Sequence, residues 1–241
     1  MIRIYRESWR ALTVFWPMVL GIAVLNESTN LWMPNPTTTL GVEIVITTLF
    51  AYYVCRFFLF GESFSTKKEN KAEPDHIGMF LLVSAVLGVV LMLVTMLCAL
   101  TILPSTFSGD TLPALGAGLI IYALLLSAFG TMLPAAAAGQ DAGPATAWTR
   151  GRKTFFSTLL CLVTGPGVVL IVTVTVSLVL TFVFALPTDT ISGSDGPSAI
   201  GFAVGSGLNA MGLLITLATV TVLSLAYKRT APTTSWDEIF A

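Results

Sequence analysis

Few side chains in this sequence could carry out chemistry inside its long apolar segments. Glu43 and Arg56 lie near the two ends of one apolar run, and Asn209 lies well inside an uncharged run. Ionisable groups at membrane depth are costly, so they mark proton, cation or substrate sites when they occur. For Glu43 we favour an interfacial carboxylate over half of a proton or cation site. For Asn209 we favour an interhelical hydrogen bond over a substrate contact.

The remaining reactive residue types form no recognisable site. The single histidine, His76, cannot supply paired axial ligands for haem, and no cluster of His, Cys, Asp or Glu has metal-ligand spacing. Cys55, Cys98 and Cys161 lie in apolar runs without paired spacing, which indicates small packing residues. The sequence contains neither a nucleophile elbow nor a phosphate-binding lysine loop, and no dinucleotide glycine fingerprint occurs in a strand–helix context. We therefore expect no enzyme activity, no catalytic residue, no cofactor and no metal.

The composition explains why polar groups are so few. The chain has 241 residues, of which 55% are hydrophobic and 10% charged, and its mean hydropathy is +0.86. Charged residues supply about a quarter of an ordinary soluble domain, and an uncharged run of about 18 residues or more is a candidate transmembrane helix. Four runs qualify and two weaker ones precede them, which predicts an all-α polytopic bundle of six transmembrane helices in one integral membrane domain, 1–241. The expected helices lie near 11–25, 40–60, 78–103, 112–138, 154–186 and 198–226.

Basic residues set the expected orientation. All 12 Lys and Arg residues fall on one face of the membrane if the chain crosses six times. By the positive-inside rule, both termini are then cytoplasmic and residues 61–77 form a solvated cytoplasmic loop. The start MIRIYRESWR lacks the features of a removable signal peptide, so the first helix should remain as a crossing. These basic groups are small and face lipid headgroups, so nucleic acid is not an expected partner.

Two breaks are expected in the helices. Pro17 should kink the first helix, and Gly165, Pro166 and Gly167 interrupt an uncharged run of 35 residues, 154–188. A straight helix of that length would measure about 50 Å, about 20 Å more than the hydrocarbon core requires. We expect 154–164 to run along the cytoplasmic interface and 168–187 to cross. A transporter hinge is disfavoured, because a matching break in the other half of the chain is missing.

Two further groups of residues are expected to make contacts rather than do chemistry. The last helix carries small residues four apart, which let helix backbones approach closely inside the bundle, or in a homo-oligomer as the alternative. Aromatic and basic residues at the cytoplasmic helix ends are expected at lipid headgroups. The packing residues are Gly201, Gly205, Gly212 and Asn209, and the interface residues are Arg56, Trp148, Arg150, Arg152 and Lys153.

Two stretches resemble a known group of proteins. YVCRFFLFGES (53–63) and LPAAAAGQDAGPATAWTRGRKTFF (133–156) are similar to segments of small six-helix membrane proteins of alphaproteobacteria. Those proteins are similar in turn to the membrane domain of glycerophosphoryl diester phosphodiesterases and to YciC-like inner-membrane proteins. The resemblance implies a bacterial inner-membrane bundle. It implies no catalytic residue, because the phosphodiesterase chemistry belongs to a separate soluble domain and this sequence ends at Ala241, shortly after the last helix.

The sequence thus favours a non-catalytic, multi-pass protein of the cell inner membrane. We expect an accessory or scaffold subunit that acts through helix packing, with lipids and other integral membrane subunits as partners. The alternative is a carrier or channel for a lipid or a small apolar solute. That alternative needs few buried charges and predicts a cavity near Glu43, Asn209 or Gly165.

Overall fold

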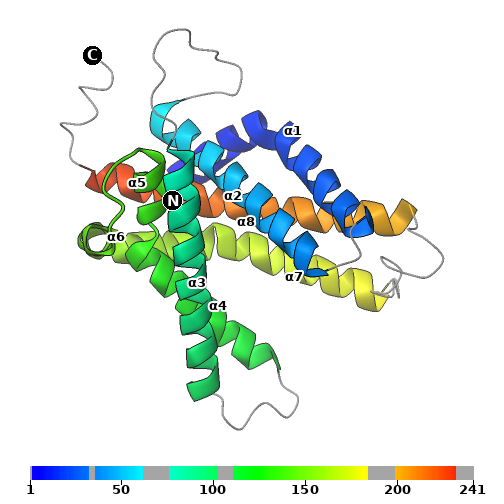
Figure 1. The fold of residues 1–241 in the computed structure, drawn as a ribbon. Coiled ribbons are helices and arrows are strands. Elements are labelled where there is room, and N and C mark those ends of the chain that lie inside the picture. The colour runs from blue at the N-terminus through cyan, green and yellow to red at the C-terminus, as the bar shows by residue number, and fades with distance from the viewer. Residues whose placement is uncertain (1, 33–35, 62–75, 103–110, 184–198, 232–241) are drawn as a thin grey trace. The chain divides into compact units, whose positions relative to one another are not determined.

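The chain is all-helical wherever its structure is described. This computed structural model describes residues 2–32, 36–61, 76–102, 111–183 and 199–231, and the regular elements in these ranges are α-helices (Figure 1). The predicted all-α class is therefore confirmed for this part of the chain. The helices are α1 (Ile2–Trp32), α2 (Pro36–Phe60), α3 (Ile77–Ile102), α4 (Thr111–Phe129), α5 (Met132–Ala137), α6 (Pro144–Thr164), α7 (Pro166–Val183) and α8 (Ala199–Thr230).

Five helical segments of the described ranges are long and apolar enough to cross a membrane, and a shorter apolar helix, Ala117–Phe129, accompanies them. The chain therefore has the helices of a multi-pass membrane protein. The count of six crossings and the side of each terminus stay predictions. The five segments are Arg6–Asn30, Thr37–Phe60, Ile77–Val94, Pro144–Leu180 and Ile200–Thr230.

The helix boundaries differ from the expected ones in two informative places. The first helix was expected over 11–25, but α1 runs from Ile2 to Trp32. The single helix expected over 112–138 is divided into α4 and α5. Pro134 explains this division, because it has no N–H to donate to the Gly130 carbonyl four residues earlier. The Leu133 N–H donates to that carbonyl instead, at 3.2 Å, which makes a tighter turn. Most of the expected loop 61–77 lies outside the described residues.

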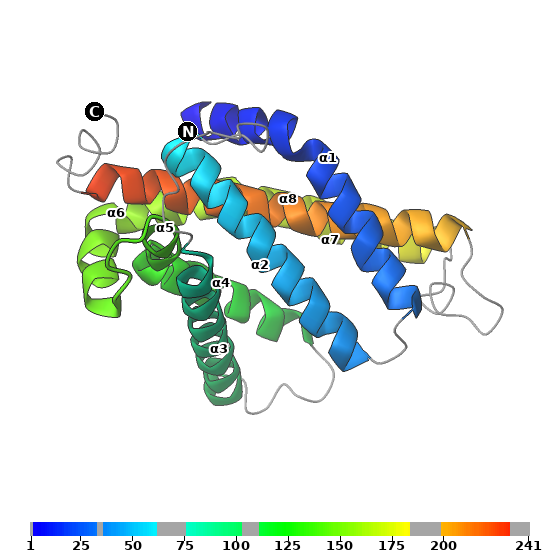
Figure 2. The ribbon, with the colours of Figure 1, turned by 45° about the horizontal axis from the view of Figure 1, so that its top comes forward.

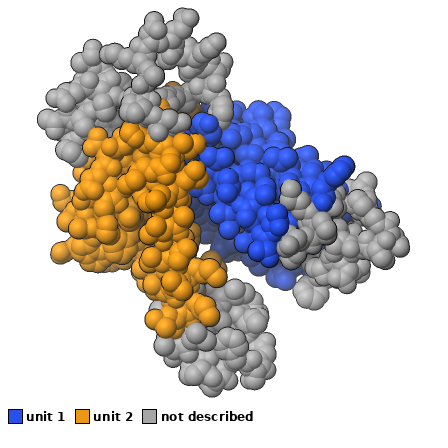
Figure 3. All heavy atoms as spheres, viewed as in Figure 1, with its two compact units in different colours: residues 1–54, 163–221 blue, residues 55–162, 222–241 orange. Residues whose placement is uncertain are grey.

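The residues cluster in two compact units, which Figure 3 colours separately. Unit 1 comprises 1–54 and 163–221, and it contains α1, most of α2, α7 and most of α8. Its core includes a T-shaped pair, Phe15 on α1 and Phe50 on α2, whose ring centroids lie 6.0 Å apart. In Figure 2, α1 and α2 form an antiparallel hairpin. The prediction of one domain over the whole chain stays a prediction.

Unit 2 comprises 55–162 and 222–241, and in it α3 packs against both α4 and α5. Helix α6 buries one face, whose residues recur at the three- and four-residue spacing of a helix. Gly151 lies on that face, where a Cβ atom would collide with the backbone carbonyl oxygen of Ala128. The buried face contains Ala147, Gly151, Thr154, Thr158 and Cys161.

A polar turn holds the start of α6. The carboxylate of Asp141 accepts hydrogen bonds from the Gly143 N–H, at 2.8 Å, and from the Thr146 hydroxyl. Together with the nearby Arg150 guanidinium, these bonds hold the pKa of Asp141 below its ordinary value, the Thr146 bond having the largest effect. Pro144 follows as the first helical residue, a position at which its missing N–H costs nothing.

Gly151→Ala tests the close contact between α6 and the end of α4. The added methyl group meets backbone rather than a flexible side chain, so the variant should lose about 1–3 kcal/mol in the free energy of unfolding. The measurement is thermal unfolding of the purified protein in mild detergent. Gly88→Ala on α3 is the matched control, because nothing lies within 4 Å of its added Cβ. Equal free energies of unfolding for the two variants and the wild type would contradict the contact.

Candidate functional site

A carboxylate lies on the buried face of α1. Buried apolar residues recur every four positions along this helix, at Ala11, Phe15, Val19 and Ala23. The next position in that series is Glu27, which is only 2% exposed, and its neighbour Asn26 is 3% exposed. The helical spacing that places apolar residues of α1 in the core of unit 1 therefore also places the Glu27 carboxyl group there, beside the Asn26 amide.

Helix α8 supplies the surroundings of the Glu27 carboxylate. Oε2 of Glu27 accepts a hydrogen bond from Nδ2 of Asn209, with 3.0 Å between the two atoms. A Cβ atom on Gly205 would collide with the carboxyl carbon and both carboxylate oxygens of Glu27. Because residues 205 and 209 are four apart on α8, they lie on the same side of the helix. Gly205 thus leaves space for the Glu27 carboxylate, and Asn209 donates a hydrogen bond to it.

A second carboxylate, Glu43 on α2, lies near the first. The Asn30 amide is 3.5 Å from Oε1 of Glu43, which is the outer limit of a hydrogen bond. Glu43 is also close enough to Glu27 for their charges to interact. On its other side, Glu43 lines an open groove of about 320 Å³ together with Leu40, Ile44, Thr47 and Thr48.

This arrangement can bind a positive charge. Oε1 of Glu27 and Oδ1 of Asn26 are buried and accept no hydrogen bond from any described residue. An ionised carboxylate out of water is costly unless a cation or several donors compensate it. Among the described residues, no group of three or more His, Cys, Asp or Glu side chains could hold a metal ion. The polar cluster of Glu27, Asn30, Glu43 and Asn209 is therefore too poor in carboxylates for a typical divalent-metal site.

The four packing residues expected on α8 have different surroundings. Gly201 and Gly205 are both buried, and Gly205 contacts Glu27 as described above. Gly212 is exposed, and nothing lies within 4 Å of the position of a Cβ there. Gly205 and Asn209 therefore meet at Glu27, whereas Gly212 takes no part in that contact. Association of two chains through this helix stays a prediction.

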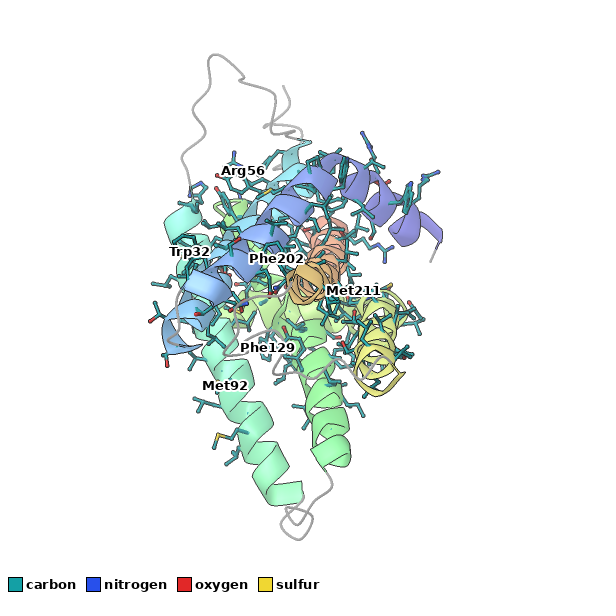
Figure 4. The ribbon with its side chains drawn as sticks, turned by 90° about the vertical axis from the view of Figure 1, so that its right-hand side faces the viewer. Trp32, Arg56, Met92, Phe129, Phe202 and Met211 are labelled. Carbon is teal, nitrogen blue, oxygen red and sulfur yellow. The ribbon has the colours of Figure 1, made fainter. Side chains whose placement is uncertain are left out.

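The residues expected at lipid headgroups also differ from one another. Trp148, Arg152 and Lys153 are exposed on α6, with the Trp148 ring stacked on Phe129 at 5.6 Å between centroids. Arg56, half-buried at the end of α2, lies over the ring of Phe60 at 5.4 Å. The label in Figure 4 marks its place on that helix.

Arg150 is turned into unit 2. Its Nη2 donates to the backbone oxygen of Asp141 at 2.8 Å, and its guanidinium carbon lies 5.2 Å from the centroid of the Tyr227 ring. A cation over an aromatic face is attracted by the ring's quadrupole. Arg150 therefore joins the start of α6 to the end of α8, and a headgroup contact stays a prediction.

One expected break lies inside a helix, and the other separates two helices. Pro17 lies inside α1, where it leaves the Thr13 carbonyl without its usual donor, and α1 changes direction along its length in Figure 2. Gly165 is the single residue between α6 and α7, and Pro166 and Gly167 are the first residues of α7. Since α6 and α7 belong to different units, the predicted bend between them stays a prediction.

The histidine and the described cysteines have structural surroundings. The His76 imidazole lies against Gly139, whose φ of +66° is a conformation that favours glycine. Cys55 and Cys161 are buried free thiols, and the Ser224 hydroxyl lies 3.8 Å from the Cys55 sulfur. The surroundings of the Cys98 side chain lie outside the described part of the structure.

Sequence reasoning missed the central residue of this site. Glu27 lies between the helices expected over 11–25 and 40–60, because the polar stretch NESTN after Leu25 suggests that the first helix ends there. The signal that could have placed it is the four-residue spacing from Ala11 to Ala23, which continues to residue 27. Asn209 and Glu43 are candidate site residues from the sequence alone, whereas Glu27, which lies near both, is not.

A double-mutant cycle tests the hydrogen bond between α1 and α8. Glu27→Ala, Asn209→Ala and the double variant should show a coupling energy of about 0.6–1.7 kcal/mol, the range of polar contacts between membrane helices. The measurement is the free energy of unfolding in mild detergent. Glu7→Ala combined with Asn209→Ala is the control pair, because Glu7 lies twenty residues before Glu27 and should give additive effects. Additive effects of Glu27→Ala and Asn209→Ala would contradict the hydrogen bond.

Comparisons of the whole chain with known proteins give no match. Neither a protein-family model, nor a curated protein sequence, nor a solved structure matches the chain. The resemblance to alphaproteobacterial membrane proteins therefore stays an expectation from the two sequence stretches.

Proposed function

We propose that this chain is a non-catalytic, multi-pass protein of the bacterial inner membrane that serves as an accessory or scaffold subunit. It acts through helix packing within a larger membrane complex. In this proposal the chain crosses the membrane six times, with both termini in the cytoplasm. Helix α4, with 19 residues, is the sixth crossing, since its length of about 28 Å nearly equals the hydrocarbon thickness.

A stripe of exposed apolar side chains on α3 is the observation that carries the proposal. Its members alternate at spacings of three and four residues, which is the pattern of a left-handed helix pair in a membrane. Phe80, Val83 and Leu87 are buried on a neighbouring side of α3. The stripe comprises Met79, Leu82, Val86, Val89, Leu93 and Met96.

The partner that fits this stripe is an apolar transmembrane helix. The described part of α3 carries no charged side chain, so neither an ion pair nor a soluble partner is favoured. Figure 4 shows the hairpin of α3 and α4, with labelled Met92 pointing away from α4. A second helix lying along the stripe would bury apolar groups that otherwise face lipid tails.

A carrier for a lipid or small apolar solute is the second candidate. The open groove beside Glu43 favours it, because Leu40 and Ile44 supply apolar walls and Thr47 and Thr48 supply hydroxyl groups. Ligand sites commonly combine apolar walls with a few polar groups. Among the described residues, only those of α2 line the groove, which is why the scaffold function is preferred.

Val89→Trp tests the scaffold proposal. The larger side chain should block a helix from packing on the stripe, so partner chains should be lost when the protein is purified in mild detergent. Quantitative mass spectrometry of the co-eluting chains is the measurement. We expect a partner at a fixed ratio to wild type and at least a tenfold lower ratio for the variant.

Val174→Trp on α7 is the matched control, because Val89 and Val174 are exposed valines, at 58% and 48%. The control should keep the wild-type ratio of partner chains. A wild-type protein that is monodisperse, with neither a partner nor self-association, would contradict the scaffold proposal. A bound lipid at a fixed ratio that Thr47→Trp removes would favour the carrier instead.

A further inference from the structure

Unit 1 contains three buried side-chain oxygens that have no hydrogen-bond partner among the described residues. They are Oδ1 of Asn26, Oε1 of Glu27 and the hydroxyl oxygen of Ser206. Asn26 adjoins Glu27 in sequence, and Ser206 adjoins Gly205, which contacts the Glu27 carboxylate. Buried polar groups in proteins are almost always satisfied by protein, water or an ion. The carboxylate and amide oxygens of Glu27 and Asn26 can only accept, so each of them requires a hydrogen-bond donor or a cation.

The charge of Glu27 points to the nature of that partner. The Glu27 carboxylate interacts with the side-chain amides of Asn30 and Asn209 and with the charge of Glu43, and none of these groups is basic. From α2, the titratable group that faces Glu27 is Glu43. Helix α8 presents Gly205 and Asn209 to it, neither of which titrates. A buried carboxylate without a basic partner among the described residues is costly, and a bound positive charge would compensate it.

The donor atoms limit which cation fits. Carboxylate, amide and hydroxyl oxygens are hard ligands, which suit a proton or an alkali-metal ion and do not suit a soft transition metal. The two carboxylates do not come with a third acidic side chain, so a multi-carboxylate divalent site is not formed among the described residues. A single positive charge would neutralise the one buried carboxylate.

We propose that Glu27 is the charged ligand of a monovalent-cation site between α1 and α8 that takes a proton or an alkali-metal ion. Asn209 fixes one oxygen of the carboxylate, at 3.0 Å, and Gly205 leaves room for the other. Oε1 of Glu27, which has no hydrogen-bond partner among the described residues, then holds the cation. The Asn30 amide, 3.5 Å from Oε1 of Glu43, belongs to the polar surroundings of this site.

The site predicts cation-dependent stability that requires the Glu27 carboxylate. Purified protein in lipid nanodiscs is unfolded thermally at constant ionic strength, in two arms. One arm lowers the pH from alkaline to mildly acidic without alkali ions, and the other replaces choline with Na⁺ or K⁺ at alkaline pH. At a cation concentration about 100 times its Kd, the ratio of folded to unfolded protein should rise about 100-fold.

Stabilisation in the first arm alone identifies a proton, and stabilisation in the second identifies an alkali ion. Glu27→Gln should lose the response while still accepting the Asn209 hydrogen bond, so it should remain folded. Gly205→Ala should weaken the response, because its methyl group displaces the carboxylate. Glu7→Gln, near the start of α1, should keep the full response. An equal response of wild type and Glu27→Gln in both arms, including no response in either, would overturn the site.

Discussion

Solvation by lipid is the constraint on which the rest of this structure depends. Along α3 and α7, large apolar side chains such as Met92 and Ile171 are 72% and 66% exposed, which water would strongly disfavour. Continuous helices satisfy their own backbone hydrogen bonds, which is the condition for placing these segments in hydrocarbon. The cores of the two units are correspondingly small, since lipid rather than protein can cover the outward faces.

The same constraint gives the few polar contacts their importance. In an apolar environment, a carboxylate at a helix interface must be neutralised or well bonded. Oε2 of Glu27 accepts the Asn209 amide, whereas Oε1 has no hydrogen-bond partner among the described residues. Arg150 is similarly turned inward, where it joins Asp141 and Tyr227 within unit 2. These two residues, rather than the abundant glycines, distinguish this chain from a plain apolar bundle.

Much of the fold could be predicted from the sequence, because long uncharged runs allow little but membrane helices. The all-helical class and most apolar segments follow from composition and length alone. The predicted first helix is too short, because the polar residues after Leu25 resemble a loop. In the structure, Glu27 continues the buried face of Phe15 and Ala23. The site around Glu27 was therefore missed, because it depends on which residue of α8 lies opposite, and Gly205 is informative only in three dimensions.

Cysteine labelling from one side of the membrane tests the central claim, that lipid solvates six crossings whose basic flanks share one compartment. Lys68→Cys and Asp189→Cys, both outside the described residues, are each introduced after Cys55, Cys98 and Cys161 are replaced by Ala. Intact spheroplasts are then treated with a membrane-impermeant maleimide. The account predicts labelling at residue 189 in intact cells and at residue 68 only after permeabilisation. Equal labelling of both residues in intact spheroplasts would contradict it.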